Sequence, residues 1–355
     1  MTAPTRKLDA ASTSEPATGV TAAELQALTF PPVKYIVPGY VPEGLTVLAG
    51  KPKIGKSWAA LAIGTAVASG DRAFGSVKCE EGDVLYLALE DNLRRLKYRL
   101  GKVLPYDDWP DRLHLRTDAP VMDEKGIETL TAWADSVPKP RLVVIDTFAR
   151  VRRRADRNDS TYDGDYKAVT ALHRFASETG IAVVLVHHVR KTDSEDPLDT
   201  VSGSTGFTGA ADAILVLTRD MSSADAILYG RGRDIEEIET ALAFDPGTCT
   251  WSIEGNAEDY RRSKERQEII NVLRNADDPM KPQEVANRLD KESGAVRKML
   301  TKMAQDGEIK RAGYGKYVLH TSNTGNSGNS SNNIQQIPLD RKGSTVTTHS
   351  GTGNT

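Results

Sequence analysis

The sequence contains few of the features that mark exported or membrane-bound proteins. Its 355 residues include only two cysteines, Cys79 and Cys249, too few for a disulfide framework or a Cys-rich zinc site. The N-terminus lacks the apolar stretch of a signal peptide, and the longest weakly polar run, residues 58–70, is too short to span a bilayer. We therefore expect reduced thiols, a cytoplasmic protein and no membrane contact.

The sequence also lacks an excess of charge of either sign. There are 46 Lys and Arg residues against 49 Asp and Glu residues, so the formal net charge is -3. This balance excludes a uniformly basic protein, and any nucleic-acid site must be a local basic patch. The length is sufficient for two domains, and a hydrophobic content of 39% lies slightly below the globular norm. We therefore expect part of the chain, at its ends, to be unstructured.

The order of apolar runs predicts an α/β fold around a mostly parallel central sheet. Near-continuous apolar runs, typical of strands buried on both faces, alternate with helical stretches such as residues 56–68 and 166–179. The strands predicted in this part of the chain are residues 45–49, 84–89, 142–146 and 182–186. Further runs follow one another closely, so we expect the last of them to be antiparallel. These runs are residues 213–217, 226–229, 241–244 and 250–253.

A change of pattern near Asn256 predicts a second, smaller domain. Three short helical segments follow it, and then a hairpin at residues 308–320 turns at Gly313. The last 35 residues include 24 Ser, Thr, Asn or Gly, a composition that cannot bury enough apolar area to order the chain. The predicted organisation is a flexible arm over residues 1–28, a principal domain over 29–256, a linker over 257–262, a small domain over 263–320 and a disordered tail over 321–355.

One motif in the principal domain points directly to a ligand. An eight-residue phosphate-binding loop lies between the predicted strand 45–49 and the predicted helix 56–68. It consists of Gly50, Lys51, Pro52, Lys53, Ile54, Gly55, Lys56 and Ser57. In such a loop the backbone N–H groups surround a phosphate, the lysine bridges the β- and γ-phosphates, and the serine hydroxyl binds Mg²⁺. We therefore predict ATP and Mg²⁺ as cofactors, with a Gly-rich turn as the alternative.

Polar residues end three of the other predicted strands. Asp146 is a candidate Mg²⁺ ligand, Glu90 is a candidate general base, and His187 is a candidate γ-phosphate sensor. Each has a purely structural alternative. Asp146 is in a position where a carboxylate commonly caps a turn, Glu90 and Asp91 could cap the helix that follows, and His187 could be a satisfied structural histidine.

These elements, in this order, resemble the RecA-like ATPases, and most closely the RepA-type replicative helicases of plasmids and phages. The resemblance covers about residues 35–254 and includes the Gly-rich segments 203–206 and 230–234. It implies a homo-oligomeric ring, usually a hexamer, with ATP bound between subunits. Arg231 and Arg233 match the basic pair that such rings insert into the neighbouring site, and one of them would act as an arginine finger. A basic pair on a surface hairpin is the alternative.

The same resemblance assigns single-stranded DNA contacts to two segments, residues 148–165 and 189–205. The first is rich in arginine, including Arg152, Arg153 and Arg154, although such a run is also typical of a solvated face. The second carries more acidic than basic residues and no aromatic residue, which argues against a simple phosphate-binding role.

The small domain resembles a winged helix. Residues 261–320 contain 14 Lys and Arg against 9 Asp and Glu. Arg297, Lys298 and Lys302 lie on the helix face away from Val296 and Leu300, as in a recognition helix that contacts duplex DNA, although many winged helices bind proteins instead. The leading interpretation is an ATP-driven motor on single-stranded DNA, with a primase or loader protein as a further partner. The alternatives are a recombination or loading ATPase without unwinding activity, and an ATP-switched DNA-binding regulator.

Overall fold

The computed structural model describes residues 19–152, 161–189, 196–201, 209–219 and 225–319. Several features predicted from the sequence lie outside these residues. They are the first 18 residues of the N-terminal arm, the tail over residues 321–355, Arg153, Arg154 and the Gly-rich segment 203–206.

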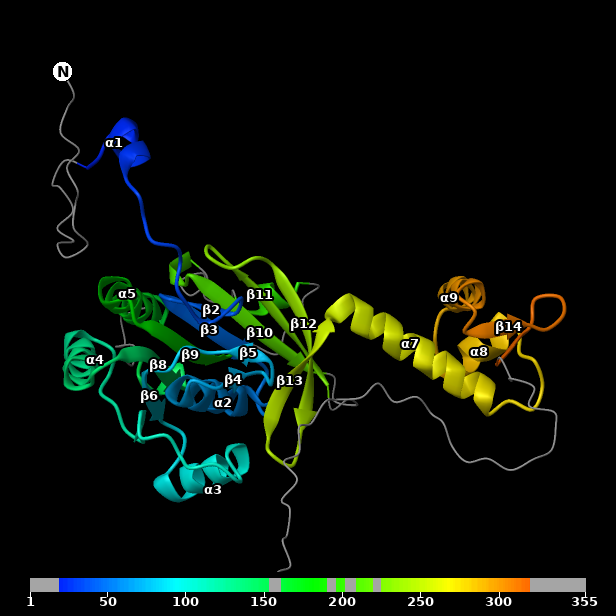
Figure 1. Cartoon of the computed structure of the whole chain (residues 1–355), viewed down its shortest axis with the longest axis horizontal. Helices are drawn as coiled ribbons and strands as arrows, with labels where there is room; N and C mark the ends of the chain where they lie inside the picture. Colours follow the sequence, from blue (N-terminus) through cyan, green and yellow to red (C-terminus); the bar gives the residue numbers. More distant parts are fainter. Residues whose placement is uncertain (1–18, 153–160, 190–195, 202–208, 220–224, 320–355) are drawn as a thin grey trace, which may run out of the picture. The chain divides into compact units, whose positions relative to one another are not determined.

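A large sheet organises the first part of the chain (Figure 1). Its strand order is β13-β12-β11-β10-β3-β9-β8-β6-β7, and the strands from β10 to β7 run parallel to one another. The bounds are β3 Leu45–Gly50, β6 Asp83–Ala88, β7 Leu113–Arg116, β8 Pro140–Asp146, β9 Ala182–His188, β10 Ala213–Arg219, β11 Ala226–Gly232, β12 Ile238–Asp245 and β13 Thr250–Asn256. The strands β11, β12 and β13 pair antiparallel, which confirms the prediction for the last strands.

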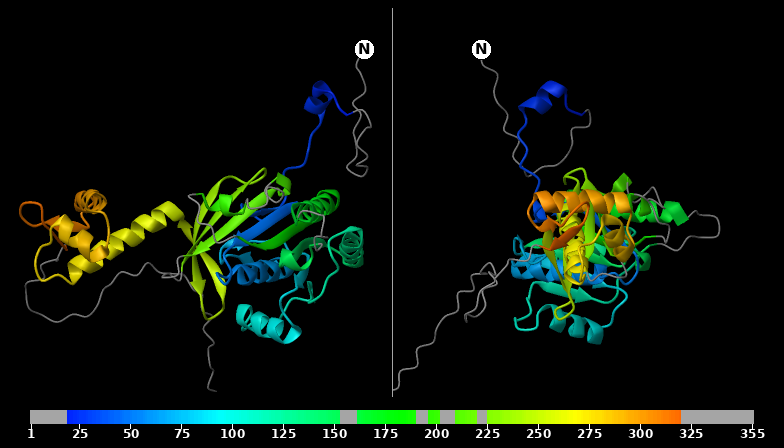
Figure 2. Two further views of the ribbon diagram at one scale, coloured as in Figure 1. Left: turned by 180° about the vertical axis from the view of Figure 1, so that it is seen from behind. Right: turned by 90° about the vertical axis from the view of Figure 1, so that its right-hand side faces the viewer.

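Helices cover both faces of the sheet (Figures 1 and 2). Their bounds are α2 Lys56–Ser69, α3 Leu93–Val103, α4 Glu124–Ser136 and α5 Thr161–Thr179. Alternate residues of each strand enter different cores, because successive side chains of a strand point to opposite faces. On β8, for example, Val144 belongs to the core beneath α2 and Val143 to the core beneath α5. The predicted α/β fold with a mostly parallel sheet is confirmed.

Two elements of this sheet domain were not predicted. The strand β7 is half-buried along its length and forms the edge of the sheet, so it lacks the continuous apolar run of a central strand. The helix α4 buries only Gly126, Leu130 and Ala134, a narrow apolar stripe that its polar residues obscure. Asp123 caps α4, since its side chain accepts hydrogen bonds from the backbone N–H groups of Lys125 and Gly126 at 3.1 and 3.3 Å.

Smaller elements surround the sheet. They are α1 Ala22–Ala27, β1 Tyr35–Val37, β2 Val41–Pro42, β4 Arg72–Ala73, β5 Val77–Lys78 and the 3₁₀ turns η1 Phe148–Arg150 and η2 Pro197–Thr200. Among the described residues, no helix has both the length and the apolar character needed to cross a membrane.

The chain divides into two compact units, residues 1–265 and 266–355. The helix α7 Ala257–Arg274 includes the boundary, and the second unit adds α8 Pro282–Leu289, α9 Ser293–Gln305, β14 Ile309–Arg311 and β15 Tyr317–Leu319. The helices predicted for this unit and its hairpin are therefore present. Their apolar faces meet in one core that includes Val296, Leu300 and Met303, the residues predicted to share a face of α9.

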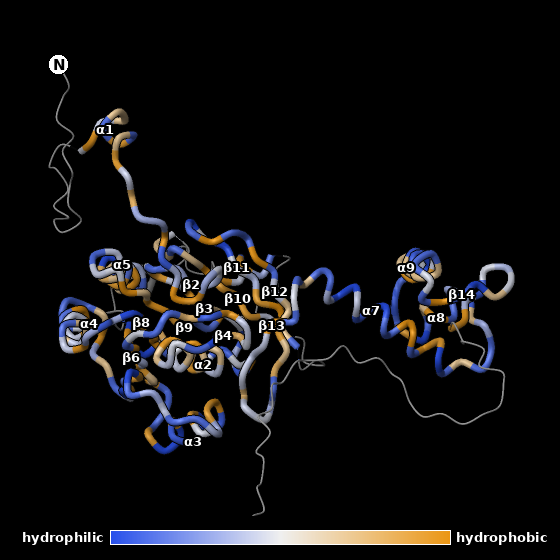
Figure 3. Tube along the Cα trace, in the orientation of Figure 1, coloured by the Kyte–Doolittle hydropathy of each residue, from blue (hydrophilic) through white to orange (hydrophobic). Residues whose placement is uncertain are grey.

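The predicted linker is helical in the structure, because α7 begins at Ala257, six residues before the predicted helix start. The Asn256 side chain accepts a hydrogen bond from the Glu258 backbone N–H at 2.8 Å, and Glu258 and Asp259 place negative charge in the first turn, which stabilises a helix N-terminus. Figure 3 shows the hydrophilic character of these first turns. The charged, apolar-poor stretch that predicts a linker is thus the solvated first part of a helix.

Candidate nucleotide-binding site

The predicted phosphate-binding loop connects β3 to α2 at the carboxyl end of the parallel strands. Two of its residues must be glycine. Gly50 has φ +155° and a Cβ there would lie 2.5 Å from the Leu217 carbonyl oxygen. Gly55 has φ +106° and a Cβ there would lie 2.8 Å from the Trp251 ring. Both side-chain-free positions let the backbone turn tightly into the helix that begins at Lys56.

Lys56 is buried inside this loop. Its ammonium donates hydrogen bonds to the carbonyl oxygens of Gly50 and Lys51 at 2.7 and 2.8 Å, and it lies 3.2 Å from Nδ1 of His188. Desolvation lowers the pKa of Lys56 to about 8, although the negative charges of Asp146 and Glu90 act in the opposite direction. Lys56 is therefore a desolvated cation inside a loop whose backbone is suited to surround a phosphate.

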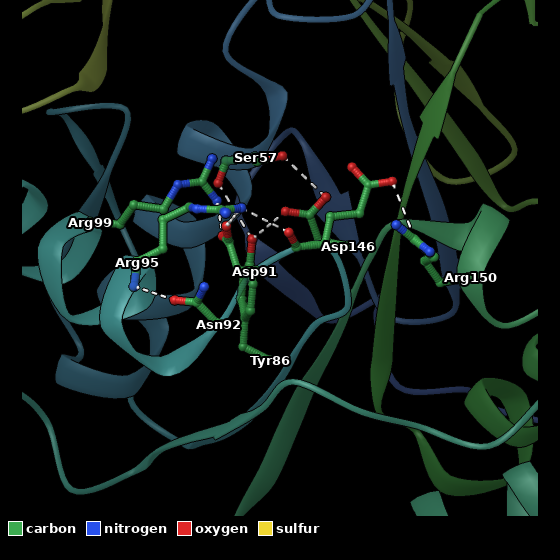
Figure 4. Close-up of polar contacts among 9 residues, drawn as sticks. Ser57, Tyr86, Asp91, Asn92, Arg95, Arg99, Asp146 and Arg150 are labelled. Carbon is green, nitrogen blue, oxygen red and sulfur yellow. Dashed lines mark hydrogen bonds and ion pairs between the residues drawn. The ribbon is translucent and has the colours of Figure 1, made fainter.

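A second group of polar atoms joins the start of α2 to the ends of β6 and β8 (Figure 4). The Ser57 hydroxyl donates to Oδ1 of Asp146 at 3.1 Å, and the Tyr86 hydroxyl donates to Oδ2 of the same carboxylate at 2.8 Å. Asp146 is 6% exposed and Tyr86 is fully buried. Burial raises the pKa of Asp146, while its hydrogen bonds with Tyr86 and Ser57 act to lower it. Burial and the nearby Asp146 charge raise the pKa of Tyr86 well above its ordinary value.

The Ser57 hydroxyl oxygen and the adjacent Asp146 carboxylate oxygen fit a magnesium site. Mg²⁺ prefers hard oxygen ligands, and in nucleotide sites it uses one or two protein ligands together with phosphate oxygens and water. No group of three or more His, Cys, Asp or Glu side chains with metal-binding geometry occurs among the described residues, and a nucleotide-dependent Mg²⁺ site does not need one. The buried carboxylate of Asp146, with its raised pKa, would also gain from a nearby cation.

Glu90 and Asp91 follow β6 and have different surroundings. Glu90 is about half exposed, with Oε1 3.7 Å from Nε of Arg150. Asp91 is instead held in place, because its two carboxylate oxygens pair with Arg95 at 3.0 Å and Arg99 at 2.5 Å (Figure 4). Both residues were candidates for capping the helix that follows.

The cap of that helix, α3, is Asn92, whose side chain accepts from the Arg95 backbone N–H at 2.9 Å. The accessible Glu90 carboxylate therefore remains the candidate base, and Asp91 has a structural role.

The strand β9 ends in the two histidines, and their surroundings differ. Gly50 is the register partner of His188 and Ala49 that of His187, so His188 lies beside the loop and contacts Lys56. His187 packs edge-on against Phe148, with ring centroids 6.4 Å apart. Burial lowers the pKa of His187 to about 4, so this imidazole is neutral at physiological pH. The histidine that contacts the loop is thus the second of the pair.

Trp251 is a part of the site that the sequence did not predict. It comes from β13, is 2% exposed, and its indole N–H donates to the Gly55 carbonyl at 3.3 Å. Phe244 and Arg219 complete a stack beside it, with the Arg219 guanidinium 5.7 Å from a Trp251 ring centroid. The only available signal was a tryptophan in a short strand about 200 residues after the loop, and nothing in the sequence linked the two.

Arg231 and Arg233 lie at the end of β11, at the opposite edge of the sheet from the loop. Arg231 is in register with Ile214 of β10, which pairs with Val47 of β3. Strands rise about 3.3 Å per residue, so Arg233 lies roughly 15 Å or more along the sheet from the loop of its own chain. Arg233 is therefore remote from a nucleotide bound there, and Arg231 lies two residues nearer to the loop along the same strand.

Acidic partners hold both arginines in place. Arg231 pairs with Glu237 and with Asp196, the latter at 3.4 Å. Arg233 lies 3.5 Å from Asp212, a largely buried carboxylate that also accepts from the Leu45 backbone N–H at 2.8 Å. Both arginine side chains remain more than half exposed, so they can still reach an incoming group.

The predicted DNA-contacting residues that the structure describes are on the surface. Arg152 is exposed, and its guanidinium lies 3.5 Å from the carboxylate of Asp165. Burial raises the pKa of Asp165. Arg297, Lys298 and Lys302 are all exposed on α9 in the second unit, opposite its buried face. Their charges are therefore available to a polyanion.

The fold and this site define the class of protein, a P-loop NTPase of the RecA-like type. The model of the AAA domain family matches residues 10–194, just over half of the chain, and the chain belongs to that family. A solved structure described as an ATPase domain superposes with a TM-score of 0.50 at 16% identity, covering 65% of this chain and 94% of that one. At that identity the likeness concerns the fold.

Two curated relatives come from bacteriophages. The gene 65 protein of Mycobacterium phage D29 is 31% identical over 106 residues, which are 28% of this chain and 44% of that protein. The gene 65 protein of Mycobacterium phage L5 is 28% identical over 138 residues, or 38% of this chain and 48% of that protein. The chain thus spans less than half the length of the curated relatives it matches.

Proposed function

We propose that this NTPase is an ATP-driven motor on single-stranded DNA, a ring-forming replicative helicase of the RepA type. One observation carries the proposal. Lys56, Ser57, Asp146 and Glu90 come from three neighbouring elements and converge at the carboxyl edge of the parallel strands, which supports phosphoryl transfer to water at this site. Fold likeness alone would not support an activity.

Each residue has a role that its surroundings support. Lys56 would exchange the Gly50 and Lys51 carbonyls for the β- and γ-phosphates, since a desolvated ammonium gains most from an anionic partner. Ser57 and Asp146 would hold Mg²⁺, which neutralises charge on the phosphates. Glu90 is exposed enough to accept a proton from the attacking water. His188, rather than His187, has the position of a γ-phosphate sensor, because it already contacts Lys56.

The location of Arg233 supports the proposed ring. Arg233 lies far along the sheet from the loop of its own chain, which supports a finger role on a neighbouring subunit for this arginine. A closed ring supplies such a neighbour at every interface. We propose a hexamer, as in the family that the motifs resemble.

DNA is the proposed substrate because of the segment after β8. Arg150 and Arg152 leave the sheet on the same side as Glu90, and Arg150 contacts Glu90 itself. A phosphate that attracts Arg150 would alter the surroundings of the candidate base, which gives DNA a route to stimulate hydrolysis. The duplex contact predicted for Arg297, Lys298 and Lys302, and a primase or loader partner, stay predictions.

The test compares Lys56→Ala and Glu90→Gln with the unmodified chain in ATP binding, ATP hydrolysis and unwinding of a forked duplex. Lys56→Ala should lose turnover and bind ATP weakly, because it removes the cation at the phosphates. Glu90→Gln should keep ATP binding and hydrolyse roughly 10²-fold more slowly, the scale of general-base loss. Asp91→Asn is the matched control and should keep most of the turnover.

The outcomes separate the candidate functions. Normal turnover in Lys56→Ala would remove the nucleotide-site proposal, and equal losses in Glu90→Gln and Asp91→Asn would remove Glu90 as the base. ATP hydrolysis that DNA stimulates, without unwinding of the fork, would instead favour a recombination or loading ATPase.

A further inference from the structure

The second unit contains a groove that the nucleotide site does not involve. It has a volume of 430 Å³ and lies where the start of α8, the middle of α9 and the β14–β15 hairpin meet. Lys281, Arg297 and Arg311 supply its charged side chains, and Tyr314 and Tyr317 its aromatic rings. Among the residues that the structure describes, no aspartate or glutamate lines it.

Backbone and side-chain contacts fix the walls of this groove. Met280 and Tyr317 exchange backbone hydrogen bonds of 2.9 and 2.8 Å, which hold the residue after Met280, Lys281, beside the hairpin. Thr301 of α9 lies 3.3 Å from the Tyr317 hydroxyl, and it stands one helical turn after Arg297. The Arg311 guanidinium lies 5.9 Å from the Tyr317 ring centroid. The three cationic residues thus come from three places in the fold, the N-cap of α8, the helix α9 and the strand β14, around one groove.

Ion pairs in the described part of the second unit leave the charge of the groove uncompensated. Within residues 266–319, Arg266 pairs with Asp306 and Glu308, and Lys291 pairs with Glu268. No ion pair of Lys281, Arg297 or Arg311 occurs among the described residues. The carboxylate of Glu284, in the first turn of α8, accepts a hydrogen bond from the Lys281 backbone N–H and so caps the start of that helix. A polyanion entering the groove would meet three cations without having to break an ion pair in this range.

An aromatic ring stands at the mouth of the groove. Tyr314 is 105% exposed, at the tip of the hairpin between Gly313 and Gly315, which both have positive φ. A large side chain kept entirely in water gains nothing in the free protein, but a flat ring beside cations is suited to stack on a nucleobase. The bases inside a duplex already stack on each other, so the Tyr314 ring can stack only on a base that is free of such stacking, as in a single strand.

We propose that this groove binds a single strand of DNA, with phosphates at Lys281, Arg297 and Arg311 and a base stacked on Tyr314. This site differs from the duplex-contacting face predicted for α9, with which it shares only Arg297. It also stands apart from the proposed ATPase activity, since no nucleotide is needed for the groove to form.

The experiment is fluorescence anisotropy of the full chain with a labelled oligothymidine and with a blunt duplex, without nucleotide, over a range of salt. For a single strand, the plot of the logarithm of the binding constant against the logarithm of the salt concentration becomes less steep by about 0.7 for each phosphate contact removed. The triple variant Lys281→Ala, Arg297→Ala, Arg311→Ala should therefore flatten the slope by about 2. The double variant that keeps Arg311, and thus its contact with Tyr317, should flatten it by about 1.4.

The hairpin offers a matched control. Lys310 adjoins Arg311 but does not line the groove, and successive side chains of a strand point to opposite faces. Lys310→Ala therefore removes the same charge from the same strand and should leave the slope unchanged. Tyr314→Ala should weaken oligothymidine binding roughly tenfold and leave duplex binding unaltered, whereas Tyr314→Phe should bind as the unmodified chain does.

Three results would overturn the proposal. The first is an unchanged slope in both the double and triple variants, and the second is an equal change in Lys310→Ala. The third is loss of duplex binding rather than oligothymidine binding, which would make the groove a duplex site. Because these measurements contain no ATP, they stand whether or not Lys56→Ala abolishes turnover.

Discussion

Removal of the Tyr86 hydroxyl should weaken the fold most strongly when Asp146 is charged. Tyr86→Phe keeps the ring in the core beneath α2 and deletes only the donor that contacts Oδ2 of Asp146 at 2.8 Å. A hydrogen bond to a charged group contributes about 1.5–3 kcal/mol, and one to a neutral group about 0.5–1.5 kcal/mol. The loss therefore depends on the protonation state of Asp146.

The direction of the pH dependence follows from the raised pKa of Asp146. A carboxyl group with a folded-state pKa above its unfolded value stabilises the fold when protonated, and that stabilisation is lost as the pH rises through the folded pKa. Above this pH the buried carboxylate depends on its donors, Tyr86 and Ser57. Tyr86→Phe should therefore cost about 2 kcal/mol at pH 8 and less at pH values below the raised pKa.

Urea unfolding followed by tryptophan fluorescence measures this loss in the relevant unit. All four tryptophans, Trp58, Trp109, Trp133 and Trp251, belong to residues 1–265, so their signal does not report on the second unit. With an m-value of about 3 kcal/mol/M, the urea midpoint should fall by roughly 0.5–1 M at pH 8.

Tyr40→Phe is the control for this experiment. The Tyr40 hydroxyl lies 3.0 Å from the Thr240 hydroxyl, a neutral partner, so its loss should cost about 0.5–1.5 kcal/mol at every pH. Equal losses for Tyr86→Phe and Tyr40→Phe across the pH range would refute the reasoning, since Asp146 would then not be a buried carboxylate that needs its donor.

Two further predictions concern hydrolysis and nucleotide binding. Arg233→Ala subunits should bind ATP but not hydrolyse it alone. Mixing them with inactive Lys56→Ala subunits should restore turnover at interfaces that combine an intact Lys56 with an intact Arg233. No recovery in verified mixed assemblies would exclude an arginine finger that acts on the neighbouring subunit. ATP affinity should fall by up to tenfold per pH unit above about pH 8, because burial lowers the pKa of Lys56 to about 8 and its ammonium loses its proton in the free protein above that pH. Calorimetric titrations should find this dependence absent in Lys56→Arg, since arginine keeps its charge.

The fold was predictable from the sequence wherever a strand is buried on both faces. The runs at β3, β6, β8, β9 and β10 contain almost only apolar residues, so period and length identify them without knowledge of the partners. Edge elements such as β7 follow no such rule, because solvent on one side permits polar residues anywhere along them. Helix ends were also poorly predicted where charge, as at the start of α7, is favourable for the helix itself.

The candidate site was predictable where one motif holds its residues together. Lys56 and Ser57 lie in a single loop, and the carboxyl ends of parallel strands bring Asp146 and Glu90 to the same edge. Which of two adjacent histidines contacts Lys56 depends on strand register, because a shift of one residue reverses the face, and register is not contained in a local pattern. The contacts of Tyr86 and Trp251 depend on tertiary packing alone.

The sheet also connects the two ends of the proposed mechanism within each subunit. The loop follows β3, the arginine pair ends β11, and β10 lies between them with continuous hydrogen bonding to both. Trp251 adds a second connection, since β13 of the antiparallel extension packs directly against Gly55. Close-packed elements of this kind move together. A change in the loop on nucleotide binding would therefore alter the position of Arg233, and in a ring this would carry the state of one site to the next.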